Sequence, residues 1–311
     1  MAKKLLASVM AFALCLFVSA ADMVVKGKNG EDRKINVVDQ SETFLRFEFV
    51  SDSTVEVTKD SSYRGHDYIT IPEKVRIEGK VYTVTSIGYA AFWGCSSLTN
   101  IKIPEGVTRI GSYAFKRCGS LTSIKIPDGV TSIGYNAFEN CSSLTSINIP
   151  ESVTSIGGGA FNYCESLTSI NIPEGVTNIG ASAFYRCSSL NSIKIPEGVT
   201  SIADYAFEGC SSLTSINIPE SVTSIGKCAF DGCSSLNSIK IPEGVTSIKK
   251  WAFDGCSSLN SINIPEGVTS IGESAFKGCS NLEIVIDNSK KKVEVGRDAF
   301  KNCKSVKWLK D

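Results

Sequence analysis

The sequence predicts an α/β repeat solenoid, in which stacked units of 23 residues form one continuous coil. Three ladders of residues predict this fold. Cysteine, phenylalanine and proline recur every 23 residues, over positions 95–279, 92–276 and 104–265 respectively. A fixed period of this length is typical of solenoids, in which each unit contacts only its neighbours.

The unit that begins at Leu98 shows how each repeat divides. Leu98, Ile101 and Ile103 give the pattern L-x-x-I-x-I, in which the two isoleucines alternate with polar residues, as expected of a short half-buried strand. Pro104 ends this strand and, with the Glu-Gly pair that follows, indicates a turn. The stretch SYAFKRC at 112–118 has room for about a turn and a half of helix. We therefore expect short parallel strands and one short helical turn in each coil.

A single unit is not expected to fold alone. Burial of its few large apolar side chains contributes about 1.5–3 kcal/mol for each side chain. Ordering the backbone costs about 1–2 kcal/mol for each residue of the unit, so the total cost is larger than the gain. Stacking buries both faces of a unit and pairs its strands on two sides, which can reverse this balance. The ladders of Leu, Ile, Val, Phe and Cys are therefore interpreted first as a stabilising core.

The regions before the repeats follow other patterns. Residues 1–21 are expected to be a signal peptide, because two lysines precede an apolar run that ends in small residues at the cleavage spacing. Residues 22–83 are expected to form a β-rich N-terminal cap, since they contain alternating strand patterns and a hairpin with a Glu-Gly turn. Residues 84–311 are then the solenoid, with about ten repeats.

Composition excludes several classes of function. Without the two lysines of the signal peptide the chain has 30 basic and 32 acidic residues, so nucleic acid is not an expected partner. No second apolar run approaches the ~20 residues of a membrane span. We expect an exported monomer that is secreted or held at the cell surface, with the periplasm as the alternative location.

Catalytic, cofactor and metal sites are not expected. The chain has one histidine, His66, and lacks nucleophile-elbow, phosphate-loop and dinucleotide motifs. Its cysteines lack the paired C-x-x-C spacing of zinc sites, and bridges between in-register neighbours would need distorted torsions. Buried reduced thiols are therefore expected, apart from Cys228, which departs from the ladder and is expected to be more accessible.

The repeated run IPEGVTSIGxxAFxGCSSLTSI, present eight or nine times between Ser86 and Cys303, is similar to the BspA-like class of leucine-rich repeats. The resemblance covers more than two thirds of the chain. It implies a right-handed leucine-rich-repeat-like coil and an exported surface adhesin that binds host matrix proteins or other cells. Pro104 follows the strand where the general leucine-rich pattern continues, so a helix-rich horseshoe is not implied. No functional residue carries over, because the class motif consists of framework positions.

Two surfaces are candidates for binding. The exposed face of the predicted sheet displays a row of Lys and Asn side chains, at Lys102, Lys125, Asn148, Asn171, Lys194, Asn217, Lys240 and Asn263. Such a flat, polar face suits an extended protein strand or a glycan, and it can equally be a solubilising surface. The helical corner carries the aromatic residues Tyr113, Tyr205 and Trp251, which are favoured interface anchors but can instead cover the neighbouring coil.

The sequence thus predicts noncatalytic binding of a protein or glycan at a cell surface. Adhesion to host or neighbouring-cell proteins is the main hypothesis. A carbohydrate-binding protein of a surface nutrient-uptake system, with aromatic rings stacked on sugars, is the alternative. A periplasmic scaffold with no ligand is the third.

Overall fold

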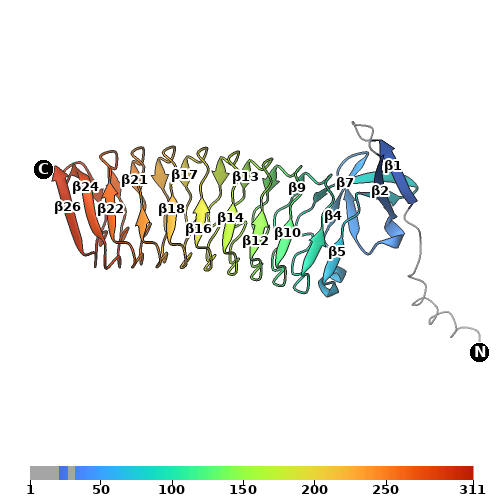
Figure 1. The fold of residues 1–311 in the computed structure, drawn as a ribbon, viewed down its shortest axis with the longest axis horizontal. Coiled ribbons are helices and arrows are strands. Elements are labelled where there is room, and N and C mark those ends of the chain that lie inside the picture. The colour runs from blue at the N-terminus through green and yellow to red at the C-terminus, as the bar shows by residue number, and fades with distance from the viewer. Residues whose placement is uncertain (1–20, 27–31, 311) are drawn as a thin grey trace, which may run out of the picture.

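The computed structural model describes residues 21–26 and 32–310, with side chains from Val37 onwards. Coils are stacked in one row, with the N-terminal strands at one end and the C-terminal strands at the other (Figure 1). The stacked solenoid predicted from the 23-residue period is confirmed by in-register pairing between successive coils. The expected signal peptide, residues 1–21, lies outside the described residues apart from Ala21.

The N-terminal region contains seven strands and two short 3-10 helices within its described residues. These are β1 (Ala21–Lys26), β2 (Asp32–Asp39), η1 (Gln40–Glu42), β3 (Arg46–Phe49), β4 (Thr54–Thr58), η2 (Ser61–Gly65), β5 (Tyr68–Thr70), β6 (Lys74–Ile77) and β7 (Lys80–Ile87). The hairpin expected from the Glu-Gly pair is confirmed. It joins β6 to β7 through Glu78 and Gly79, whose φ angles of 51° and 83° suit a two-residue turn.

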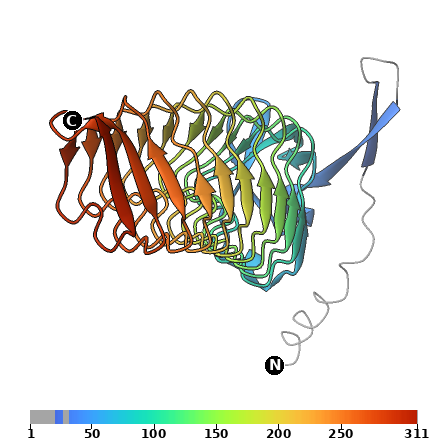
Figure 2. The same cartoon turned by 60° about the vertical axis from the view of Figure 1, so that its left-hand side comes forward.

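One row of parallel strands forms a face along the solenoid (Figure 2). Its strands are β8 (Asn100–Lys102), β10 (Ser123–Lys125), β12 (Ser146–Asn148), β14 (Ser169–Asn171), β16 (Ser192–Lys194), β18 (Ser215–Asn217), β20 (Ser238–Ile239), β22 (Ser261–Ile264), β24 (Glu283–Ser289) and β26 (Ser305–Lys310). In the described chain, β10 to β26 make one nine-stranded sheet. Ile147 of β12 is buried between exposed Ser146 and Asn148, which confirms the expected alternation.

A second row of two-residue strands follows the turn after each strand of the first row. These strands are β9 (Arg109–Ile110), β11 (Ser132–Ile133), β13 (Ser155–Ile156), β15 (Asn178–Ile179), β17 (Ser201–Ile202), β19 (Ser224–Ile225), β21 (Ser247–Ile248), β23 (Ser270–Ile271) and β25 (Glu294–Val295). β9 to β15 continue the sheet that begins with the N-terminal strands, whereas β17 to β25 form a separate five-stranded sheet within the described residues.

The N-terminal strands join the stack without a gap. β7 pairs in parallel with β9, and β5 pairs with β8 so that Ile69 lies opposite Ile101. The first strand row therefore starts at Tyr68, inside the range expected for the cap. A separate cap over residues 22–83 stays a prediction.

The prediction of a short helical turn in each coil is wrong. The solenoid is a β structure rather than an α/β structure. Residues 112–118 form consecutive turns, and no α-helix occurs in the described part of the chain. Tyr113 and Arg117 have φ angles of 60° and 63°, which cannot continue a right-handed helix. The N–H groups of Tyr113, Phe115 and Arg117 donate to carbonyl oxygens of the next coil at 2.7–2.8 Å. Hydrogen bonds between coils thus replace those within a helix.

The interior consists of columns of identical side chains, as the ladders predict. The phenylalanine rings at 92–276 are stacked, with centroids of neighbouring rings 5.1–5.5 Å apart. Beside them, ladder cysteines donate their thiols to phenylalanine carbonyl oxygens of the preceding coil. The eleven cysteines with described side chains are free thiols. The ladder residues therefore form the continuous core that a single unit cannot provide.

Glycine permits close approach of the coils after the second strand row. A Cβ added at Gly134 would lie 2.5 Å from the carbonyl carbon of Gly111 in the preceding coil. Ala203 takes this position in the coil where β15 and β17 do not pair. Lys249 takes it elsewhere and still donates its N–H to Ile225 at 3.0 Å, so a coil can adjust to a side chain here. These glycines keep side chains out of a crowded corner.

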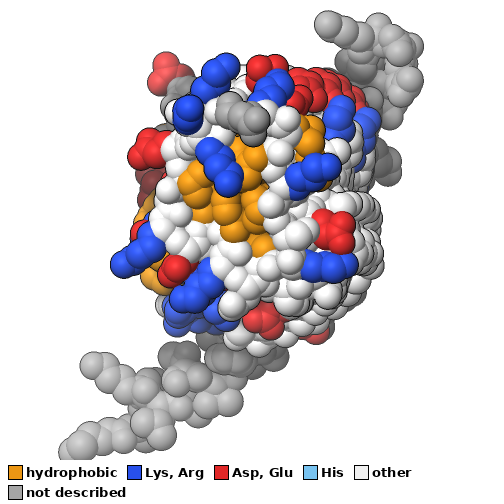
Figure 3. Space-filling view, turned by 90° about the vertical axis from the view of Figure 1, so that its left-hand side faces the viewer, with side chains coloured by type: hydrophobic (Ala, Val, Ile, Leu, Met, Phe, Trp, Pro, Cys, Tyr) orange, Lys and Arg blue, Asp and Glu red, His pale blue; other side chains and the backbone are white. Residues whose placement is uncertain are grey.

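The C-terminal end of the stack carries apolar side chains surrounded by basic ones (Figure 3). Val306 and Leu309 of β26 are exposed hydrophobic residues. Lysines flank them, and Lys304 forms an ion pair with Glu283 at 2.7 Å; charged side chains at a strand edge discourage further pairing. Among the described residues, no helix has the length and apolar character needed to cross a membrane.

Candidate functional site

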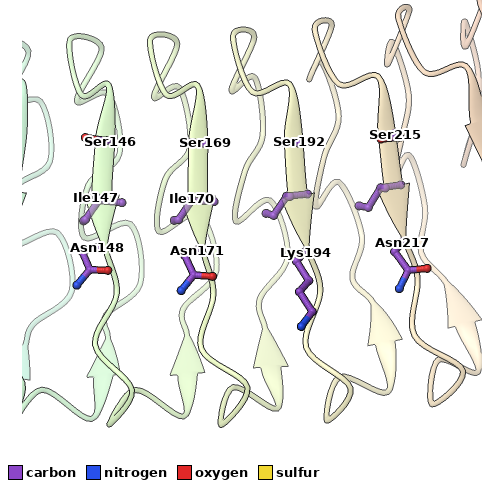
Figure 4. A pocket seen from close by; sticks show the side chains of 12 residues that line it. Ser146, Ile147, Asn148, Ser169, Ile170, Asn171, Ser192, Lys194, Ser215 and Asn217 are labelled. Atoms are coloured by element: carbon purple, nitrogen blue, oxygen red, sulfur yellow. The ribbon is translucent and has the colours of Figure 1, made fainter.

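The face of β12 to β18 forms a shallow groove of about 650 Å³. Serine, isoleucine and the Lys/Asn row line this groove. Figure 4 shows Asn148, Asn171, Lys194 and Asn217 in one row across four adjacent strands. The structure therefore brings four of the predicted residues together on one surface.

A second groove of about 760 Å³ lies on the same sheet, nearer the C-terminal end. Three predicted residues line it, namely Asn217, Lys240 and Asn263. Two acids, Glu243 and Asp287, also line it. Because Asn217 borders both grooves, the two form one continuous polar face. Lys102 and Lys125 lie on β8 and β10, outside the lining of both grooves as far as the described residues show.

Lysines of the row are held by acids at the turn of the preceding coil. The three pairs are Lys125 with Glu105, Lys194 with Glu174 and Lys240 with Glu220. Hydrogen bonds from the lysines lower the pKa of the Glu174 and Glu220 carboxyls and raise the pKa of the lysines themselves. Exposed pairs of this kind add little stability. They place a carboxylate beside each of these ammonium groups.

The predicted aromatic residues lie on the turns that replace the helical corner. Tyr113, Tyr205 and Trp251 are half-buried and have φ angles of 58–61°. Lys116 lies 5.1 Å from the ring centroid of Tyr113, and Lys227 lies 5.1 Å from that of Tyr205. These cations occupy ring surface that a ligand would need.

Trp251 belongs to a network of charged side chains. Its ring centroid lies 3.9 Å from Lys250 Nζ and 5.3 Å from Lys227 Nζ. Lys250 and Arg297 both bond to Glu273, at 2.7 and 2.8 Å. These two hydrogen bonds lower the pKa of Glu273 to about 2. The ring is therefore packed among cations rather than left free as a platform.

Two further tyrosines of the same corner extend the aromatic surface. Tyr89 and Tyr135 are 66% and 51% exposed, and each meets Tyr113 edge to face, with centroids 5.4 and 5.5 Å apart. Both tyrosines stand three residues before a ladder phenylalanine, one position earlier than Tyr113.

The structure also contains a cluster of two acidic side chains and one thiol that the sequence pattern did not predict. One ligand atom from each of Glu208, Cys228 and Asp231 lies within 4.8 Å of the others. The expectation that Cys228 is accessible is wrong, because only 4% of this residue is exposed. Burial, reinforced by the two carboxylates, raises its pKa to about 12. Burial first, and then a neighbouring acid, also raises the pKa of Glu208 and Asp231.

The single histidine contributes to packing of the N-terminal region. The His66 ring stacks on Phe44 with centroids 4.1 Å apart and 10° between the planes. Its backbone N–H donates to the carbonyl oxygen of Tyr63 at 3.2 Å. The contacts of the His66 ring are those of a packed side chain.

Comparison with known families and solved structures identifies the repeat. The BspA-type leucine-rich repeat region, described as six copies, matches residues 69–191 and 177–307. A leucine-rich repeat protein from Bacteroides ovatus ATCC 8483 is 33% identical, with 85% of this chain and 75% of that one covered and a TM-score of 0.77. A leucine-rich repeat protein from T. pallidum is also 33% identical, with 62% and 88% covered and a TM-score of 0.56.

No curated protein matches the chain. The family match nevertheless spans both strand rows from β5 to β26, and the Bacteroides ovatus protein is similar over most of the chain in sequence and in fold. The chain therefore belongs to the BspA-type leucine-rich repeat family.

Proposed function

We propose that this protein is exported and binds a protein partner at a cell surface, without catalysis, through the face of β12 to β22. The observation that carries this proposal is the continuous polar face formed by the two grooves. It spans several coils, so one extended partner can make the same kind of contact repeatedly. Adhesion to host or neighbouring-cell proteins is the role that best fits such a surface.

The chemistry of the face favours a polypeptide over a sugar. Asparagine amides and serine hydroxyls both donate and accept hydrogen bonds, which suits the peptide groups of an extended chain. Lys194 and Lys240 add positive charge, each beside a glutamate of the preceding turn, while Glu243 and Asp287 add negative charge. No aromatic ring lines either groove in the described residues, so the stacking surface that a glycan would use is missing there.

The carbohydrate hypothesis depends on the aromatic turns. Lysines cover part of Tyr113, Tyr205 and Trp251, which makes these rings poorer platforms for sugars. We therefore propose the sheet face as the binding surface. Glycan binding by the aromatic residues is the experimental result that would contradict this proposal.

Matched bulky substitutions on the two strand rows test the proposed face. The groove variant carries Ser169→Tyr and Ser192→Tyr, which place rings over the sheet face. The control variant carries Asn178→Tyr and Ser201→Tyr, at exposed positions of the second row. Tyrosine is well tolerated on exposed strand positions, so both variants should fold. Binding is measured by biolayer interferometry on a panel of extracellular-matrix proteins and cell-surface glycans.

The groove variant should bind the recognised matrix protein at least about tenfold more weakly, a loss of ~1.4 kcal/mol, while the control variant binds as the unchanged protein does. A third variant with Tyr113→Ala, Tyr205→Ala and Trp251→Ala should keep its binding. Loss of glycan binding in this third variant alone would support the carbohydrate hypothesis. Absence of binding to the whole panel would favour a scaffold without a ligand.

Export is tested on intact cells of the source organism. Brief protease treatment should release fragments of the solenoid if the protein is held at the surface. Complete protection, with digestion only after lysis, would place the protein inside the envelope and contradict the adhesion proposal.

A further inference from the structure

Glu208, Cys228 and Asp231 form a group of potential metal ligands away from the sheet face. Cys228 and Asp231 share one turn, in which the Asp231 N–H donates to the Cys228 carbonyl at 3.3 Å. Glu208 comes from the preceding coil, whose Gly209 N–H donates to the Asp231 carbonyl at 2.7 Å. These backbone bonds hold the three side chains together from two adjacent coils.

In the described part of the chain, the two carboxylates differ from their equivalents in other coils by the lack of a direct ion pair. Neither Glu208 nor Asp231 forms an ion pair within the described residues, whereas equivalent acids of other coils do: Glu139 pairs with Lys116 at 2.8 Å, and Asp254 with Lys277 at 3.7 Å. Repulsion between neighbouring acids contributes to the raised pKa of both carboxyls. Arg186 and Lys227 act on Glu208, and Lys277 acts on Asp231, but burial and the neighbouring acid outweigh these cations. A directly coordinated cation would complete the charge compensation.

Another coil shows how the same two positions are satisfied without an ion. Asn136 occupies the position of Cys228, and Glu139 that of Asp231. The Asn136 amide donates to the Glu139 carboxylate at 2.5 Å. In the Cys228 coil a buried thiol, 4% exposed, takes the place of this amide as the hydrogen-bond partner of Asp231, and Glu208 is the second neighbouring carboxylate.

We propose that Glu208, Cys228 and Asp231 bind a divalent transition-metal ion, with Zn²⁺ as the best fit. Thiolate and carboxylate are both zinc ligands, and tetrahedral Zn²⁺ needs ligand atoms roughly 3.3–3.8 Å apart. Atoms already within 4.8 Å of one another reach that spacing by small side-chain rotations. Ca²⁺ and Mg²⁺ fit less well, because they select oxygen ligands.

An access route and a fourth ligand are available. A surface depression of about 330 Å³ is lined by Glu208 and Asp231, by Gly209 and Gly232, and by Glu165, Arg186 and Ser188. The two glycines have no side chains to obstruct it. Water entering there completes the coordination. On binding, the Cys228 thiol releases its proton to solvent and the sulfur becomes the ligand. The ion then links two adjacent coils.

The test uses Co²⁺ as a spectroscopic substitute for Zn²⁺, added to the purified protein after chelator treatment. A thiolate-to-cobalt charge-transfer band should grow to saturation at about one Co²⁺ per chain and disappear when Zn²⁺ is added. Zn²⁺ should also raise the melting temperature, because it binds the folded state. Absence of the thiolate band at micromolar Co²⁺ would overturn the proposal.

Variants establish which residues bind the ion. Cys228→Tyr should remove the band and still fold, because Tyr113 and Tyr205 occupy the same position at φ 60° and 61°. Asp231→Asn and Glu208→Gln should each weaken binding at least about tenfold. Glu139→Gln, the matched acid of another coil, should leave binding unchanged. A band that persists in Cys228→Tyr would assign the metal to the ladder cysteines and refute the site.

Discussion

The Sγ atom of Cys164 lies 3.2 Å from the carbonyl oxygen of Phe138 in the preceding coil and donates a hydrogen bond to it. The same bond recurs along the ladder, from Cys118 to Cys279. Each cysteine thus fills space as a small apolar side chain and also donates a second hydrogen bond to a buried carbonyl group, which already accepts from a backbone N–H of its own coil. This double role explains why a thiol, rather than an alanine, stands at this corner.

Replacing a central ladder cysteine should destabilise the solenoid. Cys164→Ala removes the sulfur from a fully buried site and removes one of the two donors to the Phe138 carbonyl, which keeps the Cys141 N–H at 3.1 Å. The expected loss is about 1–2 kcal/mol, measured by urea unfolding. Cys303→Ala is the control, because Cys303 is only partly buried and its loss should be smaller. Equal losses at the two sites would contradict the proposed role of burial.

The glycines of the crowded corner should tolerate substitution less well than a glycine with space around it. Gly134→Ala places a Cβ 2.5 Å from backbone of the preceding coil and should cost about 1–3 kcal/mol. Gly119→Ala places it 3.7 Å from the nearest side-chain atom and should be neutral or stabilising by up to ~1 kcal/mol. Thermal unfolding of the two variants, measured side by side, distinguishes these outcomes.

The left-handed positions of the turns should discriminate between residue types. Ser182 has a φ angle of 57°, so the β-branched variant Ser182→Val should lose about 1–2 kcal/mol. Ser182→Gly should be at least as stable as the parent protein, since glycine adopts this conformation without steric strain. Chemical denaturation of both variants checks the prediction. A stable valine variant would show that the turn can change its conformation.

The Glu273 network should make stability depend on pH in the acid range. Its pKa is lowered from 4.5 to about 2 in the folded protein, so the folded state favours the carboxylate. This contribution is fully present above pH 4.5 and is lost as the pH falls towards 2. The melting temperature of the parent should therefore exceed that of Glu273→Gln at pH 7, and the difference should shrink between pH 4.5 and 2. High salt should also reduce the difference in melting temperature between the two proteins. A difference independent of pH would exclude the ion-pair explanation.

The strands could be predicted because their pattern is local. Ile147 alternates with Ser146 and Asn148 in sequence, and the structure buries only the isoleucine. The candidate row on the sheet followed from this alternation, since equivalent residues of in-register strands must lie side by side. What a partner contacts on this face does not follow from the pattern, because framework periodicity is the same with or without a ligand.

The turns could not be predicted in the same way. Residues 112–118 contain good helix formers, but alternate N–H groups bond to the next coil, and such bonds depend on a neighbour that local sequence does not show. The group of potential metal ligands could not be predicted either, because it also depends on contacts between neighbouring coils. Glu208 is distant in sequence from Cys228 and Asp231, and only the stacking of their coils brings the three ligand atoms within 4.8 Å.

The sequence by itself determined that the chain is a stack of 23-residue coils with an apolar, cysteine-containing interior, because a repeated unit with too few buried contacts is stable only against copies of itself. Tertiary structure alone decided the conformation of the corner and the surroundings of each side chain. Lysines cover the aromatic rings, acids hold the lysines of the sheet, and a thiol meets two carboxylates. These contacts join neighbouring coils, so they are fixed by how the coils stack rather than by the order of residues within one coil.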